Sequence, residues 1–558
     1  MKTRTPVLWT LGRIRRRIPE ILIMTAAHMV QAAFGVLFAL GTRDVIDSAI
    51  SADRGLLVSA CIKQGRIIAV ILFTLTLYRH LREKLNAQLD RDWKKDILHG
   101  LLHGEYADVS RYHSAELLNR MNNDVKTVDD GVLTLLPNIS AMVVRLGMAA
   151  AVLAALDPAF TAIILAIGVA VIIATGLLRR RLKTLHKDVS RRDGIVSGFI
   201  QEIMEKLLMV QAMDVSGEVE NRADLLMKQR YALQRKRKNV SLFANTAVSL
   251  MHYGAGFLAL TWCAFRLMRG EMTFGSLTAV TQLVNQLQNP FVNLSNVIPK
   301  YIAMVAASER LMELEKIQGQ PDDSYDGAEL YEKMEAICGE NLTFAYERDT
   351  VLENADFRLK KGSFAVITGQ SGIGKSTLLK LLLGVFKCKG GQLYTILNSN
   401  ETPAKLPLDR KTRRLFAYVP QGNLILSGTI KENIVISHPQ ASDSEIFRAL
   451  YVADAEDFVK NLPLGLDTPL GESGAGLSEG QLQRIAIARA ILGGAPILLL
   501  DECTSALDEQ TERTVLKRIS RLENRTCIAV THRPAALEIC DCQLEIADRK
   551  IKVTEINK

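Results

Sequence analysis

The stretch GQSGIGKST, from Gly369 to Thr377, decides the fold of the second half of this chain. It matches G-x-x-x-x-G-K-[ST], a pattern typical of loops that wrap phosphates with backbone N–H groups. The predicted strand Ser363–Gly369 comes before it, and the apolar helical segment TLLKLLLGVF comes after it. Because the motif requires this strand–loop–helix context, the sequence predicts a nucleoside triphosphate site.

Each part of this loop has a predicted role. The glycines let backbone N–H groups surround the phosphates, Lys375 neutralises charge on the β- and γ-phosphates, and the Ser376 hydroxyl binds Mg²⁺. ATP and Mg²⁺ are therefore the predicted ligands. The loop residues predicted to contact ATP are Gly369, Gln370, Ser371, Gly372, Ile373, Gly374, Lys375, Ser376 and Thr377.

An acidic motif, ILLLDE, spans Ile497–Glu502. It is predicted to form a buried strand that ends in two carboxylates. Asp501 would hold Mg²⁺ directly or through water, and Glu502 would polarise the attacking water as general base. The pair is informative because a phosphate-binding loop precedes it in the same chain.

The pattern around these motifs is that of an α/β domain. After the polar stretch Gln318–Gly327, short β-branched strands such as Thr526–His532 alternate with helices, which indicates a mostly parallel sheet. We expect a transmembrane domain at residues 1–317, a linker at 318–330 and a nucleotide-binding domain at 331–558.

The first half is rich in apolar runs long enough to cross a membrane, which takes about 20 residues. Three runs contain no Asp, Glu, Lys or Arg, and three weaker ones lie between and after them. The sequence therefore predicts an all-α bundle of six transmembrane helices with long cytoplasmic extensions. The predicted spans are Ile21–Thr42, Ser59–Tyr78, Val132–Leu156, Pro158–Leu178, Val240–Phe265 and Gly275–Ala306.

Basic residues predict the orientation of these spans. Arginines cluster near the N-terminus and after the fourth span, whereas the short link Asp157–Pro158 carries no basic residue. The N-terminus, the two long connections and the ATPase domain are therefore expected in the cytoplasm, with the chain in a bacterial inner membrane. The net charge of +9 is explained by these loops rather than by nucleic-acid binding.

The two long connections, His80–Gly131 and Arg179–Asn239, are predicted to be helical. In SAELLNRMNNDVKTVDDGV, apolar residues recur at steps of three and four. Such helices suit mechanical coupling to a cytoplasmic domain, although surface helices of an ordinary domain are an alternative.

The sixth span is unusually polar. Five amide side chains recur at helical spacing on one face, and they could line a transport route or join helices by hydrogen bonds. Pro290 would kink this helix, and His28 and Arg145 are further candidates for buried polar groups. The five amides are Gln282, Asn285, Asn289, Asn293 and Asn296.

The order of the remaining motifs resembles that of the ATP-binding cassette (ABC) transporters. LSEGQ (Leu477–Gln481) precedes ILLLDE, and FAY, YVPQG, SALD and VTHR stand in the family order. GESGAGLSEGQ and SERLMEL resemble the exporter subtype, and the resemblance covers nearly the whole chain. It implies a half-transporter that works with a second half-transporter, as a homodimer or a heterodimer.

The resemblance also assigns roles within the chain's own site. Tyr346 would stack on adenine, Gln421 would sense the γ-phosphate and Mg²⁺, and His532 would contact the γ-phosphate. The implied catalytic residues are Glu502, His532, Lys375 and Gln421, and the implied metal-binding residues are Ser376, Gln421 and Asp501.

Other residues would act across the dimer. Ser478, Gly480 and Gln481 would contact the nucleotide held by the other subunit, and Asp508 would communicate between subunits. One departure is Glu479, which stands where the family usually has glycine. Its carboxylate either points to solvent or weakens the shared site.

The sequence thus predicts an ATP-hydrolysing exporter that alternates access across the membrane as two nucleotide-binding domains dimerise. A lipid-like or amphipathic small molecule is the expected cargo, and the bundle is expected to contact membrane lipids. A peptide exporter and a membrane-anchored regulatory ATPase without transport are the alternatives.

Overall fold

The structure is a computed structural model, and it describes residues 5–317, 324–346, 349–398, 403–422, 425–471 and 476–556. Within the helices, the side chains of residues 171–183, 186–187, 244–245, 248, 291–296 and 298 lie outside the description. The chain divides into two compact units. The first unit contains Met1–Leu102 and Tyr112–Ile317, and the second contains His103–Arg111 and Gln318–Lys558.

The first unit is built of helices joined by short turns, and its described residues contain no strand, as predicted. Six long helices of 32 to 53 residues make up most of it. They are α2 (Ile18–Ile50), α3 (Arg54–His103), α6 (Val125–Leu156), α7 (Pro158–Glu205), α9 (Ser216–Met268) and α10 (Phe274–Glu315). The shorter elements are α1 (Pro6–Arg13), η1 (Ile14–Arg17), α5 (Ser114–Asn119), η2 (Arg120–Asp124) and α8 (Leu207–Ala212).

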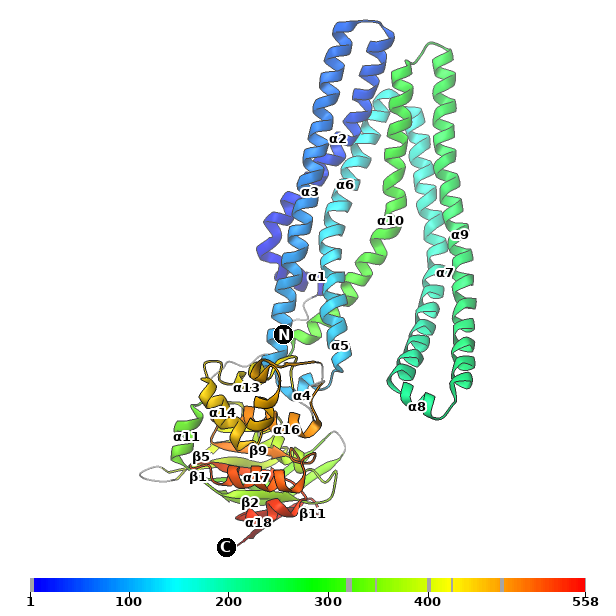
Figure 1. Cartoon of the computed structure of the whole chain (residues 1–558). Coiled ribbons are helices and arrows are strands. Elements are labelled where there is room, and N and C mark those ends of the chain that lie inside the picture. The colour runs from blue at the N-terminus through cyan, green and yellow to red at the C-terminus, as the bar shows by residue number, and fades with distance from the viewer. Residues whose placement is uncertain are drawn as a thin grey trace. The chain divides into compact units, whose positions relative to one another are not determined.

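Three helical segments of the described residues are long and apolar enough to cross a membrane: Pro6–Ile50, Arg54–His103 and Ser114–Leu156. A shorter apolar helix covers Pro158–Ala170. The predicted fourth and fifth spans lie in α7 and α9, which run side by side in Figure 1. Parts of both spans fall on side chains outside the description.

The predicted short link between the third and fourth spans is present. Helix α6 ends at Leu156 and α7 begins at Pro158. Asp157 caps α7 by accepting a hydrogen bond from the Phe160 backbone N–H (3.1 Å), and it also accepts one from Arg266 Nη1 (2.6 Å). A single carboxylate therefore closes the turn and fastens it to α9.

The helix predicted through SAELLNRMNNDVKTVDDGV is not uniform. Five residues, Arg120–Asp124, form the π-helical turn η2 between α5 and α6. A π turn adds a residue and rotates the later part of the helix. The turn itself carries two buried polar residues, Arg120 and Asp124, whereas Leu118 just before it is 60% exposed. The helical period missed this turn because polar contacts with α10 determine it.

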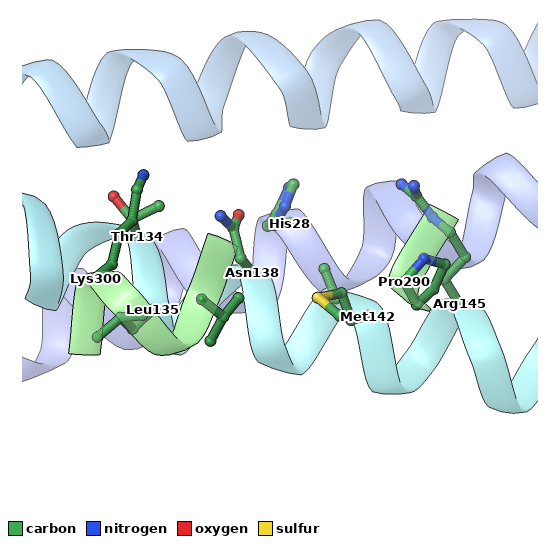
Figure 2. A pocket seen from close by; sticks show the side chains of 10 residues that line it. His28, Thr134, Leu135, Asn138, Met142, Arg145, Pro290 and Lys300 are labelled. Atoms are coloured by element: carbon green, nitrogen blue, oxygen red, sulfur yellow. The ribbon is translucent and has the colours of Figure 1, made fainter. Parts of the chain in front are cut away.

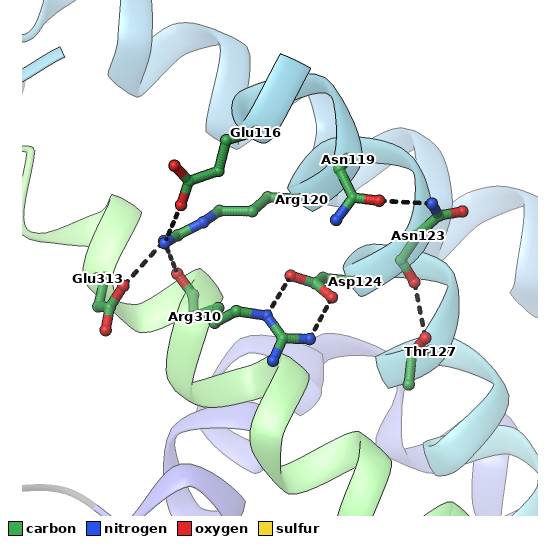
Figure 3. Close-up of polar contacts among 8 residues, drawn as sticks. All are labelled: Glu116, Asn119, Arg120, Asn123, Asp124, Thr127, Arg310 and Glu313. Atoms are coloured by element: carbon green, nitrogen blue, oxygen red, sulfur yellow. Dashed lines mark hydrogen bonds and ion pairs between the residues drawn. The ribbon is translucent and has the colours of Figure 1, made fainter. Parts of the chain in front are cut away.

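Those contacts form a network of ion pairs (Figure 3). Arg120 Nη2 pairs with Glu116 (2.7 Å), and its Nη1 pairs with Glu313 on α10 (3.0 Å). Arg310, also on α10, forms two bonds of 2.6 and 2.8 Å with the buried carboxylate of Asp124. The network fixes the start of α6 against the C-terminal part of α10.

The second unit is an α/β fold with a mostly parallel six-stranded sheet, as predicted. Its strand order is β12-β11-β3-β10-β9-β6, and only β12 pairs antiparallel. The strands are β3 (Phe364–Thr368), β6 (Phe416–Val419), β9 (Ile497–Asp501), β10 (Thr526–Val530), β11 (Cys542–Ala547) and β12 (Lys550–Glu555).

A second sheet is antiparallel, with the order β2-β1-β4-β5, and a short pair joins β7 to β8. These strands are β1 (Met334–Ala345), β2 (Thr350–Lys360), β4 (Gly390–Leu397), β5 (Ala404–Pro407), β7 (Gly428–Thr429) and β8 (Pro469–Leu470). The helical elements of this unit are α4 (Tyr106–Val109), α11 (Gly327–Lys333), α12 (Lys375–Leu382), η3 (Arg410–Leu415), α13 (Ile430–Val435), α14 (Asp443–Val452), α15 (Glu456–Asn461), η4 (Gly465–Asp467), α16 (Glu479–Leu492), α17 (Glu509–Ser520) and α18 (Pro534–Ile539).

The six-stranded sheet is buried on both faces. On β9, Leu498 and Leu500 belong to one hydrophobic cluster, together with α14 and α16, whereas Ile497 and Leu499 belong to another that includes α12. Because side chains alternate along a strand, an unbroken apolar run such as ILLL is what two-sided burial requires.

The boundaries differ slightly from the predicted ones. Strands β3, β9 and β10 are one or two residues shorter than the predicted strands. Strand β9 ends at Asp501, because the next residue, Glu502, has a φ of +49°. The linker predicted at 318–330 is partly helical, since Asp326 caps α11 by accepting from the backbone N–H groups of Ala328 and Glu329. Residues Gln318–Asp323 lie outside the description. All eight cysteines are free thiols.

Candidate active site

The phosphate-binding loop connects β3 to α12. Gly369 and Gly374 have φ values of +143° and +115°, and a Cβ at Gly374 would lie 2.1 Å from Val351 Cγ1. Both positions therefore require glycine. Gly372 also has a positive φ, but no atom lies within 4 Å of where its Cβ would stand. The loop is thus held tightly at its ends and open in its middle.

Lys375 spans this loop. Its buried ammonium donates to the carbonyl oxygens of Gly369 (2.9 Å) and Gln370 (3.1 Å), and it lies 2.9 Å from His532 Nε2. An ammonium can only donate hydrogen bonds, so His532 accepts through Nε2 and carries its proton on Nδ1. The predicted residues Lys375 and His532 are therefore in direct contact.

A carboxylate reaches the loop from β9. Ser376 Oγ donates to Asp501 Oδ1 (2.9 Å), and Tyr418 on β6 donates to Asp501 Oδ2 (3.0 Å). Burial and the neighbouring Asp501 raise the pKa of Tyr418 well above its usual value, so the phenol stays protonated. Tyr418 was not among the predicted site residues, although it stands in the YVPQG motif.

The predicted general base comes directly after Asp501. Gln421 Nε2 donates to Glu502 Oε2 (2.8 Å), and Glu502 occupies the left-handed backbone region. A non-glycine residue there stores backbone strain of about 1–3 kcal/mol, a cost often found at functional sites. The turn aims the carboxylate of Glu502 away from the strand and toward Gln421.

Tyr346 lies at the edge of the loop, as its predicted role requires. Its ring is 42% exposed, its hydroxyl is 3.0 Å from Thr377 Oγ1, and it packs edge-on against Phe344 and Phe386. The aromatic neighbours fix the orientation of the ring and leave part of it accessible.

The LSEGQ residues contact another part of the unit. Ser478 caps α16 through a capping box with Gln481, and a Cβ at Gly480 would lie 2.9 Å from the Ala506 carbonyl oxygen. Glu479 is exposed in the first turn. Among the described residues, no hydrogen bond joins this motif to Gly369–Thr377. Asp508 caps α17 by accepting from Thr511 N–H, which lowers the pKa of its carboxyl.

Three residues that the sequence did not reveal position the SALD segment. Gln483 bonds to Ser505 Oγ (3.2 Å) and accepts from Ala506 N–H (3.1 Å). Arg533, next to His532, donates to the Ser505 and Leu507 carbonyl oxygens (2.6 and 2.7 Å). Arg533 also pairs with Glu512, which is 1% exposed. Gln483 lies in α16, Glu512 lies in α17 and Arg533 directly precedes α18, so the spacing within a single element gave no signal for these contacts.

The segment His103–Arg111 belongs to this unit although it comes from the first long connection. Lys387 Nζ pairs with Glu105 (2.6 Å), Tyr106 packs edge-on against Phe386, and Arg410 donates to the His103 carbonyl oxygen. Phe386 also contacts Tyr346. The segment therefore lies one aromatic ring away from the edge of the phosphate-binding loop.

The arrangement at the carboxyl end of β3 and β9 fits a triphosphate. An open glycine loop, a lysine and the start of a helix provide donors for phosphate oxygens. The hydroxyl of Ser376, the carboxylate of Asp501 and the amide of Gln421 provide the oxygen atoms that a hard divalent cation prefers.

Comparison with known proteins identifies the class. The ABC transporter transmembrane region matches residues 21–291, and the ABC transporter ATP-binding family matches residues 352–505. A bacterial Atm1-family ABC exporter with ATP bound has the same fold, with a TM-score of 0.75, 22% identity and coverage of 97% of this chain and 95% of that one.

Three relatives illustrate the range of this class. The chain is 30% identical to an ATP-dependent lipid A-core flippase of Photobacterium profundum, over 70% of this chain and 66% of that protein. It is 27% identical to the putative multidrug export protein YgaD of Bacillus subtilis, over 77% and 74%. It is 31% identical to a leukotoxin translocation protein of a Pasteurella haemolytica-like species, over 65% of this chain but only 51% of that protein.

This chain belongs to the ABC transporter family, with the membrane domain and the ATP-binding domain fused as in exporters. It is an integral membrane protein of the class that couples ATP hydrolysis to export. These findings confirm the recognition, the fold class and the enzyme class that the sequence predicted, and they confirm ATP as ligand.

Proposed function

We propose that this protein is a half-transporter that exports an amphipathic, lipid-like small molecule when two ATP-binding domains close over ATP. The observation that carries the proposal is the convergence of Lys375, Ser376, Asp501, Gln421 and Glu502 at one sheet edge. Such a site hydrolyses nucleotide, and the same chain supplies a helical membrane unit.

In this proposal the loop Gly369–Thr377 holds the phosphates and Tyr346 stacks on adenine. Ser376, Asp501 and Gln421 hold Mg²⁺, which neutralises phosphate charge when bound. Tyr418 keeps Asp501 oriented by donating to its second oxygen. Lys375 is already directed into the loop and can exchange its carbonyl contacts for phosphate oxygens.

Glu502 acts as the general base and Gln421 holds it in place before substrate arrives. The 2.8 Å bond between them makes the position of the Glu502 carboxylate depend on Gln421. His532 carries its proton on Nδ1 and accepts from Lys375 through Nε2. When Lys375 turns to phosphate, Nε2 of His532 is released to contact the γ-phosphate.

A second subunit completes each site. Ser478, Gly480 and Gln481 lie at the start of α16. Ser478 and Gln481 form the capping box, and Gly480 lies close to the Ala506 carbonyl oxygen. In this proposal a partner's nucleotide approaches the positive end of this helix. Asp508 would lie at the subunit boundary. The partner is a second copy or a related half-transporter.

The segment His103–Arg111 provides the coupling between nucleotide and helices. It comes from a predicted cytoplasmic connection, and its Tyr106 contacts Phe386 beside Tyr346. This arrangement supports coupling rather than the alternative of an independent surface helix. The basic residues near the N-terminus and after the fourth span support an orientation in a bacterial inner membrane with the N-terminus and the ATPase domain on the cytoplasmic side.

The relatives indicate the cargo by class. A flippase of lipid A-core and a multidrug exporter among the relatives favour an amphipathic compound. The translocation protein for leukotoxin keeps peptide or protein export as the second candidate.

The test begins with the chain purified alone in lipid bilayers. Mg²⁺-dependent ATP hydrolysis that is lost in Glu502→Gln would support a working homodimer. ATP binding without turnover in the unsubstituted chain would mean that a different subunit must complete the site. Hydrolysis that survives Glu502→Gln unchanged would overturn the assignment of the general base.

A further inference from the structure

The first unit contains a cavity of about 340 Å³ between α2, α6 and α10 (Figure 2). Helix α6 contributes Thr134, Asn138 and Arg145, which lie on one helix face at steps of four and seven residues. His28 enters from α2, and Lys300 enters from α10. The volume lies within the range of about 300–1,000 Å³ that is typical of small-molecule sites.

The charge of this cavity has one sign. Among its ten lining residues are Arg145, Lys300 and His28, and none is an aspartate or glutamate. In Figure 2, Lys300 and Arg145 stand at opposite ends, with His28 and Asn138 between them. The cavity therefore presents two permanent cations and intervening polar groups that can form hydrogen bonds.

Arg145 is partly buried, and part of its guanidinium has no hydrogen-bond partner in the described part of the chain. Its Nε atom is buried, and among the described residues nothing forms a hydrogen bond with that atom. Leaving a buried charge unpaired is costly, so such groups are usually paired or hydrogen-bonded. The guanidinium nevertheless lines an open cavity, where an added anion could satisfy it.

His28 is held in place by protein contacts. Its ring stacks on Tyr78 of α3, with centroids 4.5 Å apart, and its Nδ1 is 3.1 Å from Gln31 Oε1. The ring is therefore already oriented before any ligand binds. A preordered ring lowers the entropic cost of binding.

The rest of the lining is apolar, with Leu135, Ala141, Met142, Pro290 and Val297. A small inorganic anion would use the cations but not these side chains. A neutral hydrophobic compound would use these side chains and leave Arg145 unpaired. An amphiphile with an acidic head group is the ligand class that satisfies both.

We propose that this cavity binds an anionic amphiphile, a molecule with a phosphate or carboxylate head group on an apolar chain, whose head group pairs with Arg145. The inference rests on the proposed function, since it names the cargo class of the same exporter. Of the amides predicted on the sixth span, Gln282, Asn285 and Asn289 do not line the cavity, and the side chains of Asn293 and Asn296 lie outside the description.

The test measures binding without nucleotide, so that it is independent of ATP hydrolysis. The full chain is placed in phosphatidylcholine nanodiscs, and radiolabelled dodecyl phosphate, dodecanoate and dodecanol are titrated in a scintillation proximity assay. Inorganic phosphate is added as a competitor. We expect dodecyl phosphate or dodecanoate to bind at least about tenfold more tightly than dodecanol.

The variants separate charge from structure. Arg145→Gln should weaken binding of the acidic amphiphile by at least about tenfold, whereas Arg145→Lys should retain affinity within about threefold. Lys300→Gln should cost about threefold, because Lys300 is exposed. The matched control is Arg191→Gln on α7, an exposed arginine outside the cavity, which should leave binding unchanged.

Three results would overturn the proposal: equal binding of dodecanol, unchanged affinity in Arg145→Gln, or competition by inorganic phosphate as strong as that by dodecyl phosphate. The last result would mean that the cavity takes a free anion. ATP hydrolysis by the unsubstituted chain and by Glu502→Gln is measured in the same nanodiscs. A failure of the proposed function would appear in ATP hydrolysis, whereas a failure of the proposed ligand class would appear in the binding assay, so the two are distinguishable.

Discussion

The nucleotide site and the membrane cavity hold their charged groups in opposite ways. At the nucleotide site, Lys375 bonds to loop carbonyls, Ser376 bonds to Asp501, and Gln421 bonds to Glu502. In the cavity, Arg145 has a buried Nε with no hydrogen-bond partner among the described residues. The charged groups of the nucleotide site are held in place by bonds within the protein. The cavity leaves Arg145 Nε without such a bond, so a ligand could supply one.

The largest expected effect is a loss of ATP binding that leaves ligand binding in the membrane cavity unchanged. Lys375→Ala should reduce ATP affinity and hydrolysis by at least about 100-fold, because the side chain both shapes the loop and carries the charge that phosphates need. Binding of dodecyl phosphate to the same preparation should not change. ATP affinity is measured by titration with a fluorescent analogue. Parallel loss of both ligands would indicate a folding defect and remove the contrast.

Within the second unit, a buried ion pair and an exposed one can be compared for their contribution to stability. Arg533→Gln should lower the free energy of unfolding by about 2–3 kcal/mol, because it leaves a carboxylate that is 1% exposed without its cation. Arg549→Gln, in an exposed pair with Glu353, should cost less than about 0.5 kcal/mol. Thermal unfolding followed by circular dichroism compares them. Equal losses of unfolding free energy in the two variants would mean that burial of Glu512 does not determine the contribution of its ion pair.

In the first unit, Asp124 and Arg310 also form an ion pair in which the carboxylate is buried and the guanidinium is more exposed. The carboxylate is 5% exposed and the guanidinium 47% exposed, so Arg310→Gln should destabilise the unit by about 1–2 kcal/mol through the unpaired Asp124. The η2 turn should also exchange amide hydrogens faster, because its buried Asp124 loses the bonds from Arg310 on α10. Hydrogen exchange at residues 116–128 reports this change. Unaltered protection there would show that the π turn does not depend on the pair.

A smaller effect is expected at Tyr418. Tyr418→Phe removes the hydrogen bond to Asp501 Oδ2 and should raise the Mg²⁺ concentration for half-maximal hydrolysis about tenfold. The raised pKa of Tyr418 keeps its hydroxyl protonated up to and beyond its usual range, so the ratio between variant and unsubstituted protein should stay constant from about pH 6 to 9. A ratio that changes across that range would contradict the assigned donor.

The smallest effect concerns Glu479. Its exposed carboxylate lies in the first turn of α16, where it stabilises the helix. In the proposed dimer it would repel a partner's triphosphate. Glu479→Gly should increase ATP hydrolysis about two- to fivefold at low ionic strength, and the gain should shrink in salt. Glu479→Gln separates charge from backbone freedom. A lower rate in both variants would show that the carboxylate assists the shared site.

Much of the nucleotide site could be predicted because its chemistry is local in the sequence. GQSGIGKST places glycines, lysine and serine within one loop, and ILLLDE places two carboxylates at the end of one strand. Tyr418 and Arg533 could not be assigned in this way. Their partners, Asp501 and Glu512, are 83 and 21 residues away. Tyr418 reaches Asp501 because β6 pairs with β9, and Arg533 reaches Glu512 because α18 packs against α17.

The membrane unit was predictable in class but not in detail. Apolar runs and basic loops predict long helices and their orientation, since length and hydropathy are properties of each segment alone. On the polar face predicted for the sixth span, Asn285 and Asn289 are exposed in this unit, and the side chains of Asn293 and Asn296 lie outside the description, so a role in lining a transport route stays a prediction. Rotation of a helix about its axis depends on its neighbours, and one sequence period does not specify it.

The sequence by itself determined that this chain is an ABC exporter half with an ATP site, because each motif carries its chemistry within a few residues. Tertiary structure alone decided that His28, Arg145 and Lys300 face one cavity, and that Arg120 and Asp124 turn inward at a π bulge. The physical reason is that charge pairing and cavity shape depend on how helices far apart in the sequence pack together.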